Sequence, residues 1–300
     1  MTIPWLPVSV VGTAVAFYVG FKNSQSYDRL WEARKIWGSI INSSRAWGST
    51  VKAYSYHAEL SKEDLHAIKK RLIYRHIAYI YTLRNQLLVP TQWEHVSLNH
   101  NFGKFNRRRL ERFGLGQFKE EAEAVRMDKY LPEAAELAKH NYTNLATQLF
   151  DIQSEELAEL NRRDILTIRK QLDLQEIIKE MYDHQGRAER IKRFPFPRQY
   201  GSMSFLFVCL FIILLPLGMM GEFAKLGQWG VWLSIPFGVL IGWMYVLMEL
   251  IGDYSENPVE GLMNDVPMLS ICRTIEIDLL QMLGEKDVPP PIVPKNSVLM

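Results

Sequence analysis

Residues 9–37 read SVVGTAVAFYVGFKNSQSYDRLWEARKIW, and they change from uncharged to strongly charged at Lys22 with no helix breaker at the junction. No charged side chain precedes Lys22, and roughly 20 apolar residues suffice to cross a bilayer as a helix. After Lys22, apolar residues continue three or four positions apart with charged residues between them, which is the spacing of an amphipathic helix. The stretch predicts one long helix that crosses a membrane and continues beyond it.

Two further uncharged runs, residues 201–221 and 226–248, are long enough to cross a bilayer. Pro216 and Pro236 lie inside them. Membrane helices tolerate proline better than soluble helices, because neighbouring groups satisfy the freed backbone. Sustained alternation of apolar and polar residues, which is typical of strands, does not occur in the sequence. The chain is therefore predicted to be an all-α membrane protein.

Basic residues are concentrated between the first and second apolar runs. Residues 22–198 carry 31 of the 35 Lys and Arg against 23 acidic residues, a balance of about +8, whereas the short connection between the last two runs holds only Lys225. Basic residues close to span ends favour the cytoplasmic side. The pattern predicts a multi-pass protein of the inner membrane with a large cytoplasmic domain. It also places the N-terminus outside, which is natural if an earlier span is missing.

These runs and charges predict the organisation of the whole chain. The predicted parts are a transmembrane helix at 1–22, a cytoplasmic helical domain at 23–199, a transmembrane helix at 200–222, an outer hairpin at 223–228, a transmembrane helix at 229–249 and a cytoplasmic tail at 250–300.

Within the middle block, capping residues and prolines predict the helix boundaries. Ser61, followed by acidic residues, is a capping signal that opens a helix ending at Leu88, before Pro90. We expect residues 91–119 to be irregular, residues 120–149 to be helical, and a further helix to run from Ser154 to residue 193. Prolines after that helix lead the chain into the second span.

Candidate metal ligands are few. Glu94, His95 and His100 lie close together in the sequence, but the histidines lack the i, i+4 spacing of a helical zinc site and have no cysteine partner. We interpret them as surface loop residues. The two cysteines, Cys209 and Cys272, have neither a metal-ligand spacing nor the pattern of a disulfide framework. The sequence therefore predicts no metal and no cofactor.

A basic run, KFNRRRLER at 104–112, has Phe105 inside it and Phe113 beside it. Basic residues with aromatic neighbours are a weak nucleic-acid pattern. In a cytoplasmic block attached to a membrane, attraction to anionic lipid or simple solvation is favoured instead, and no nucleic-acid partner is expected. The nucleotide-binding, zinc-protease and serine-hydrolase motifs are also absent from the sequence, so the chain is not predicted to be an enzyme.

The three apolar runs have no ionisable groups in their interiors, whereas pumps and transporters usually keep such groups at mid-membrane. A conducting path lined by apolar side chains is the other option, because hydrophobic constrictions gate pores by dewetting. Thr13, Phe17 and Phe21 lie four apart on one stripe of the first helix, next to small residues. Such a stripe lines a pore, faces lipid or packs against other helices.

Several motifs are similar to those of bacterial bestrophins. The matching residues are GFKN at 20–23 with Gly20, then Tyr27, Arg29, Trp31, Glu32, Arg34 and Trp37, and near the end Asn257, Pro258 and Asp265. The first block resembles the family signature closely, except that Leu30 stands where the family usually has the first Trp of a pair. Bestrophins have four membrane helices, and the resemblance implies that this chain begins at the second.

The resemblance implies a homopentameric channel that passively conducts small monovalent ions, mainly anions in the family and monovalent cations in some bacterial members. One helix per subunit lines the membrane neck of such channels, and the matching positions are Thr13, Phe17 and Phe21. Ile168 or Leu172 stands nearest to a second, cytoplasmic aperture. The implied partners are further copies of the chain, membrane lipid and permeant ions. A membrane-anchored cytoplasmic scaffold that conducts nothing is the alternative that composition leaves open.

The acidic segment after the last span differs from that of animal bestrophins, which hold calcium there. Only Glu256, Glu260 and Asp265 remain, with Leu262 and Met263 interrupting them. Calcium takes six or more oxygen ligands, so no calcium clasp is predicted. The tail is expected to wrap a neighbouring subunit, and its proline-rich end at 289–294 is expected to be an extended strap or disordered.

Overall fold

The computed structural model describes residues 3–54, 60–97, 100–194, 196–227 and 229–300. These residues form helices, 3₁₀ turns and connecting segments, and within them the only β-type pairing is an isolated bridge between Lys295 and Val298. The chain divides into two compact units. Unit 1 comprises Met1–Glu32 and Phe194–Pro258, and unit 2 comprises Ala33–Arg193 and Val259–Met300.

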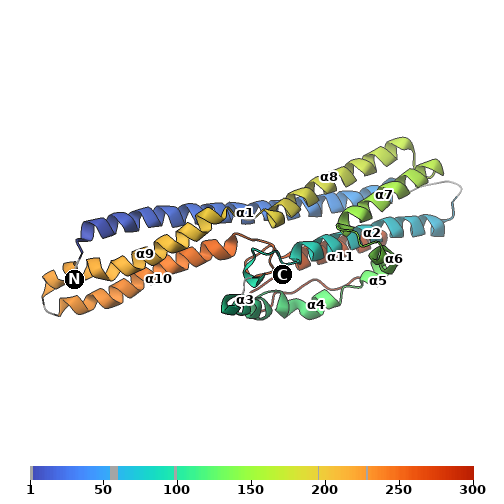
Figure 1. Cartoon of the computed structure of the whole chain (residues 1–300). Coiled ribbons are helices and arrows are strands. Elements are labelled where there is room, and N and C mark those ends of the chain that lie inside the picture. The colour runs from blue at the N-terminus through green and yellow to red at the C-terminus, as the bar shows by residue number, and fades with distance from the viewer. Residues whose placement is uncertain (1–2, 55–59, 98–99, 195, 228) are drawn as a thin grey trace. The chain divides into compact units, whose positions relative to one another are not determined.

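Helix α1, Trp5–Tyr54, is continuous over 50 residues, as the blue ribbon in Figure 1 shows. The uncharged start and the charged continuation thus belong to one helix, which confirms the prediction. The helix contributes its first part to unit 1 and its second part to unit 2.

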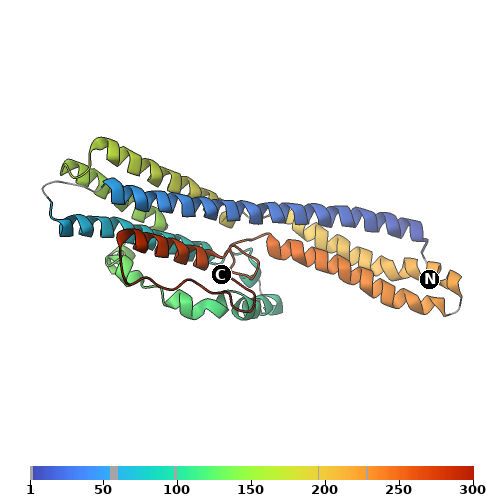
Figure 2. The ribbon, with the colours of Figure 1, turned by 180° about the vertical axis from the view of Figure 1, so that it is seen from behind.

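Unit 1 contains the other two predicted spans, α9 (Arg198–Phe223) and α10 (Ser234–Ser255). Two 3₁₀ turns, η3 (Ala224–Leu226) and η4 (Gly230–Leu233), lie between them. Figures 1 and 2 show α9 and α10 side by side. In the described residues three helical segments are long and apolar enough to cross a membrane, namely α1, Gly201–Leu226, which includes most of α9, and Gly230–Ser255, which includes α10.

The core of unit 1 is apolar and joins the first part of α1 to α9. It is formed by Val8, Val15, Val19, Val208, Phe211, Leu215 and Met219. Close approach of the two helices requires glycine at Gly12, because a Cβ atom there would lie 2.7 Å from Cε2 of Phe211. A larger side chain at position 12 would therefore push α1 and α9 apart.

Unit 2 is built on long helices that pack in pairs. These helices are α2 (Lys62–Leu88), α7 (Leu145–Arg162), α8 (Ile168–Arg193) and α11 (Met268–Leu283). Helix α2 packs against α7 and α11, and α7 packs against α8. Ser61 caps α2 by accepting a hydrogen bond from the Asp64 N–H, so the predicted start and end of this helix are both confirmed.

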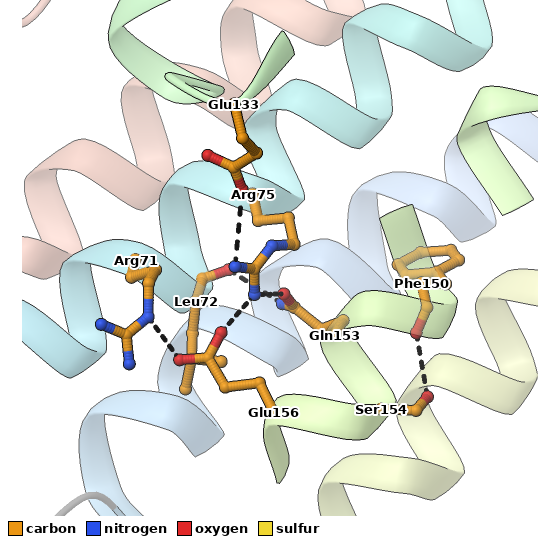
Figure 3. A network of polar contacts seen from close by, with 8 residues as sticks. All are labelled: Arg71, Leu72, Arg75, Glu133, Phe150, Gln153, Ser154 and Glu156. Carbon is orange, nitrogen blue, oxygen red and sulfur yellow. Dashed lines mark hydrogen bonds and ion pairs between the residues drawn. The ribbon is translucent and has the colours of Figure 1, made fainter. Parts of the chain in front are cut away.

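A polar network joins α2 to α7 (Figure 3). The Arg75 guanidinium donates to Oε1 of Gln153 at 3.1 Å and pairs with Glu156. Arg71 pairs with the other oxygen of Glu156, and Gln153 donates in turn to the Leu72 carbonyl at 2.9 Å. Because Arg75 is only 7% exposed, these partners satisfy a charge that would be costly to bury alone.

The expectation of an irregular segment at 91–119 is wrong. Much of it forms η1 (His95–Ser97), α3 (His100–Phe113) and η2 (Leu115–Phe118). Gly103 does not break α3, whereas Gly114 ends it: a Cβ there would lie 2.4 Å from the Gly261 carbonyl oxygen. Glycine marks the helix end here because another segment approaches closely.

The single helix expected at 120–149 is also wrong. The structure has three short helices there, α4 (Lys119–Glu123), α5 (Met127–Tyr130) and α6 (Ala134–Lys139). Proline at 132 disfavours helical geometry in the residue before it, and α5 ends accordingly at Tyr130. Asn141 has a positive φ of 47°, which prevents continuation from α6 into α7.

Ser154 does not start a helix but lies inside α7, and its hydroxyl donates to the Phe150 carbonyl at 2.9 Å (Figure 3). The N-cap of α7 is Asn144, which accepts from the Thr147 N–H at 3.1 Å. A serine that bonds back to the preceding turn is compatible with a helix interior, so capping residues alone predicted the wrong boundary.

The proline-rich end is an extended strap on unit 2. Arg273 of α11 donates to the Pro290 carbonyl at 3.1 Å, and Lys295 donates to the Gln117 carbonyl at 2.9 Å. The Ser270 N–H donates to the carbonyl of Met300 at 2.6 Å. These contacts confirm an extended strap, and wrapping of a neighbouring subunit stays a prediction.

Candidate pore-lining site

The first part of α1 has two opposite faces. Three valines are buried on one face, Val8, Val15 and Val19. At ~100° of rotation per residue, Phe17 stands about 180° from the mean direction of these valines. Phe17 is 77% exposed and Phe21 is 52% exposed. Thr13, one turn before Phe17, is also exposed. The three predicted neck residues therefore form one stripe that the rest of unit 1 leaves uncovered.

An open cavity of about 760 Å³ runs along this stripe. Thr13, Phe17 and Phe21 line it together with Phe211 of α9 and Tyr245 of α10. The Tyr245 hydroxyl donates to a backbone carbonyl of α1 at 3.0 Å, so the tyrosine ties α10 to α1 beside the stripe. The lining is mostly apolar, with hydroxyl groups from Ser9, Thr13 and Tyr245, and a ring of apolar side chains around an axis would hold water poorly.

A buried charge cluster follows directly after the stripe. Lys22 is 1% exposed, and its Nζ lies 2.7 Å from Oε1 of Glu249 and 3.5 Å from Oδ1 of Asp253. The Ser204 hydroxyl donates to the other oxygen of Glu249. These contacts join α1, α9 and α10, and they fix the rotation of α1 one residue beyond Phe21.

Sequence reasoning missed this cluster because it considered each span alone. The predicted spans at 1–22 and 229–249 end on Lys22 and Glu249, two charges of opposite sign. A single basic residue at the end of one span and a single acidic residue at the end of another are a pattern from which this ion pair could have been predicted.

Two further contacts hold α1 in place. Gly252 of α10 lies so close to Asn23 that a Cβ atom there would be 2.1 Å from Oδ1 of Asn23. Six residues further along α1, Arg29 donates to the backbone carbonyls of Glu256 at 2.8 Å and Phe194 at 2.9 Å. The signature arginine thus binds the segments that enter and leave the two later spans.

The other residues of the family signature differ in how far they are buried. Gly20, Trp31 and Arg34 are exposed, and Glu32 is half-buried. Trp31 stacks on Tyr27 with ring centroids 6.4 Å apart. The residues near the end of the chain that belong to the signature, Asn257, Pro258 and Asp265, are all buried.

Ile168 and Leu172, the residues predicted for a cytoplasmic aperture, lie in the first turns of α8 in unit 2. Their exposed fractions are 61% and 60%. Two large apolar side chains that their own unit leaves uncovered are available to line a constriction or to meet another copy of the chain.

The acidic segment after α10 forms a tight buried turn. Oδ2 of Asp265 accepts from the N–H groups of Gly261 at 2.8 Å and Leu262 at 3.0 Å, and Gly261 has a positive φ of 89°. Burial raises the pKa of Asp265 to about 8. In the described residues no group of three or more His, Cys, Asp or Glu side chains is arranged to hold a metal ion.

The interpretation of Glu94 and His95 as surface loop residues is wrong. Both are buried, at 2% and 6% exposure. Glu94 pairs with Lys192 of α8, and Nδ1 of His95 lies 3.5 Å from Oε2 of Glu260. Polar residues in a loop are buried here because each finds a charged partner from a distant segment. The side chain of His100 lies outside the described residues.

Comparison with known proteins identifies the family. A family model described as Bacterial/Fungal Bestrophin protein matches residues 1–281. The chain belongs to this bestrophin family. Among curated relatives, the voltage-dependent anion channel-forming protein YneE of Escherichia coli (strain K12) is 27% identical over 289 residues, which cover 96% of this chain and 80% of that protein. The voltage-dependent anion channel-forming protein RSc3414 of Ralstonia nicotianae is 25% identical, with coverage of 94% and 81%.

The bestrophin fold is also found among solved structures. A bacterial bestrophin homolog from Klebsiella pneumoniae has a TM-score of 0.71 and 23% sequence identity, with 95% of this chain and 89% of that chain covered. The predicted family and the all-α membrane fold are thus confirmed. As a bestrophin with three span-length helices, the chain is a protein of the bacterial inner membrane.

Proposed function

We propose that this bestrophin forms a homopentameric channel that passively conducts small monovalent ions through an apolar neck. Thr13, Phe17 and Phe21 of each copy line the neck. The observation that carries the proposal is the uncovered stripe of these residues, opposite the buried valine face of α1. Exposed phenylalanines on a span-length helix face lipid, another helix or a pore, and a symmetric assembly can direct the stripe at its axis.

Anions are the proposed permeant ions, in keeping with the names of the curated relatives. The neck residues carry no charge, so the neck itself does not exclude cations by sign. Ile168 and Leu172 are proposed to form a second constriction on the cytoplasmic side. Replacing both by alanine would then change conductance or selectivity, whereas unaltered currents would remove this constriction from the proposal.

The test is reconstitution of the purified full chain into liposomes and planar bilayers. We expect ion flux above that of protein-free vesicles, and a reversal potential in a KCl gradient that follows chloride. A reversal potential that follows potassium would show a cation channel instead. The same measurements are made on a version of the chain with an added N-terminal span. If both proteins are folded and neither gives flux or current, the channel proposal is contradicted.

Oligomeric state is measured separately. Native mass measurement and cross-linking in detergent are expected to give five copies of the chain. A monomer at all protein concentrations would contradict the pentamer, because a neck made of one stripe per chain needs several chains.

A further inference from the structure

Helix α3 has an exposed cationic stripe that the proposed channel does not use. At ~100° per residue, Lys104, Arg108, Arg112 and Phe105 fall within a sector about 100° wide. All four side chains are exposed, and Phe105 is 58% exposed. The helix contains five Lys or Arg and a single acidic residue, Glu111, in its sequence HNFGKFNRRRLERF. This composition gives one helix a local charge of about +4 (5 − 1).

The opposite side of α3 is held by its own unit. Asn106 is fully buried, Gly103 is buried, and Arg107 donates to the Val96 carbonyl at 2.6 Å. The cationic stripe therefore has a defined orientation, because the buried side fixes which side chains point outward.

Phe113, the last residue of α3, points about 80° away from Phe105 at ~100° per residue, so it lies beside the cationic stripe and not within it. It is 45% exposed, and the Arg112 guanidinium lies 5.3 Å from the centroid of its ring. Exposed phenylalanines interleaved with basic residues are typical of helices that lie on a membrane surface, with the rings at the boundary between head groups and acyl chains. Simple solvation explains the cations but not the exposed ring of Phe105 between them.

The covalent chain also links α3 to a membrane span. The Leu115 N–H, just after α3, donates to the Gly261 carbonyl at 3.0 Å. Gly261 follows Ser255, the last residue of α10, by six residues (261 − 255). Six residues of extended chain reach about 20 Å at most, so the tether between the span and the segment that holds α3 is short.

We propose that the cationic stripe of α3, formed by Lys104, Phe105, Arg108 and Arg112, docks on an anionic lipid surface. The basic side chains pair with lipid phosphates, and Phe105 enters the head-group boundary. The cytoplasmic leaflet attracts basic segments near a membrane, which matches the sign of the stripe. The proposal concerns lipid contact and does not depend on ion conduction.

The test uses the full chain in nanodiscs with an environment-sensitive fluorophore at Asn101→Cys, an exposed position on the same sector of α3. Cys209→Ala removes the partly exposed native thiol, and Cys272 is buried. With phosphatidylglycerol in the disc we expect a blue-shifted emission and quenching by spin-labelled lipid. With phosphatidylcholine alone, or with 1 M salt, which shortens the Debye length to about 3 Å, both signals should be lost.

The key variant replaces Lys104, Arg108 and Arg112 by Gln. Docking should weaken roughly 100-fold, since each basic residue near an anionic surface contributes strongly. The matched control replaces three exposed basic residues of other helices, Lys119, Arg162 and Lys179, whose side chains are 76%, 71% and 76% exposed. It removes the same net charge and should dock as the unchanged chain does.

Three outcomes would overturn the proposal. Equal emission in neutral and anionic discs means that α3 does not touch lipid. Equal loss of docking in the control variant assigns the effect to overall charge and not to the stripe. An emission shift caused by single-stranded DNA but not by anionic lipid would assign the surface to nucleic acid.

Discussion

Nζ of Lys22 lies 2.7 Å from Oε1 of Glu249, in a site where both side chains are almost completely buried. The two residues are 227 positions apart in the sequence, and their pairing joins α1 to α10 directly beyond the phenylalanine stripe. A charge in such a site depends on its partner, because removing one member leaves the other buried and uncompensated.

Lys22→Met is therefore expected to destabilise the protein by about 3 kcal/mol, because it leaves the Glu249 carboxylate buried with only a serine hydroxyl as donor. Thermal unfolding in detergent measures the effect. The double variant Lys22→Met with Glu249→Gln should recover part of the loss, because the buried group at position 249 is then neutral, and Asp253, the second partner of Lys22, is 30% exposed.

The control for this prediction is Lys179→Met, which removes one member of an exposed pair with Glu176. Exposed pairs contribute little to stability, so its melting temperature should not change. A Lys22→Met protein as stable as the Lys179→Met protein would show that the buried pair does not anchor α1.

Gly252→Ala is expected to weaken the contact between α10 and α1. The added Cβ would lie 2.1 Å from Oδ1 of Asn23, and overpacking of this kind costs roughly 1–3 kcal/mol. The matched control is Gly186→Ala in α8, where no atom lies within 4 Å of an added Cβ. That change should stabilise its helix by up to about 1 kcal/mol. Thermal melts that move in the same direction for both variants would contradict the close approach.

The sequence was sufficient to predict helices that depend on local patterns. The switch of composition at Lys22 and the cap at Ser61 are both readable within a few residues, and α1 and α2 were predicted correctly. Contacts between distant segments were not readable in this way. Glu94 and His95 are buried because Lys192 and Glu260 reach them, and no periodicity in the loop records those partners.

The same limit applies to the candidate site. The spacing of Thr13, Phe17 and Phe21 predicted a stripe, but three alternatives for its environment remained. The burial of the valine face and the contacts of Lys22 and Tyr245 show which side of α1 packs inside the chain. Those contacts come from α9 and α10, about 200 residues later in the sequence.

Asp265 is expected to make stability depend on pH. Burial raises its pKa from 3.8 to about 8, so between these values the folded protein holds a proton that the unfolded chain releases. The contribution to stability is complete below about pH 4 and is lost as the pH rises through about 8. Asp265→Asn stays neutral and keeps an acceptor for the Gly261 and Leu262 N–H groups.

The melting temperature of Asp265→Asn, relative to the unchanged chain, should therefore increase between pH 5 and pH 8, by an amount equivalent to a few kcal/mol at ~1.4 kcal/mol per pKa unit. The matched control is Asp183→Asn, an exposed acid in α8 that pairs with Arg187, and its difference from the unchanged chain should be the same at both pH values. A parallel pH dependence of the Asp265→Asn and unchanged proteins would show that this carboxyl is ionised in the fold.

The last prediction concerns the neck. Phe17→Ala with Phe21→Ala should raise open probability or current, because removing both rings widens the constriction and allows water to remain in it. The folded chain should lose little stability, since Phe17 is 77% exposed and Phe21 is 52% exposed within it.

The comparison is Val15→Ala with Val19→Ala on the opposite face of α1, where the two valine side chains are 4% and 0% exposed. That pair should lower stability by about 2 kcal/mol or more, as truncation of buried side chains does. Single-channel recording beside a thermal melt separates the two faces. If the phenylalanine variant were the less stable of the two and conducted like the unchanged chain, those rings would pack between helices, and the pore would have to be lined by another surface.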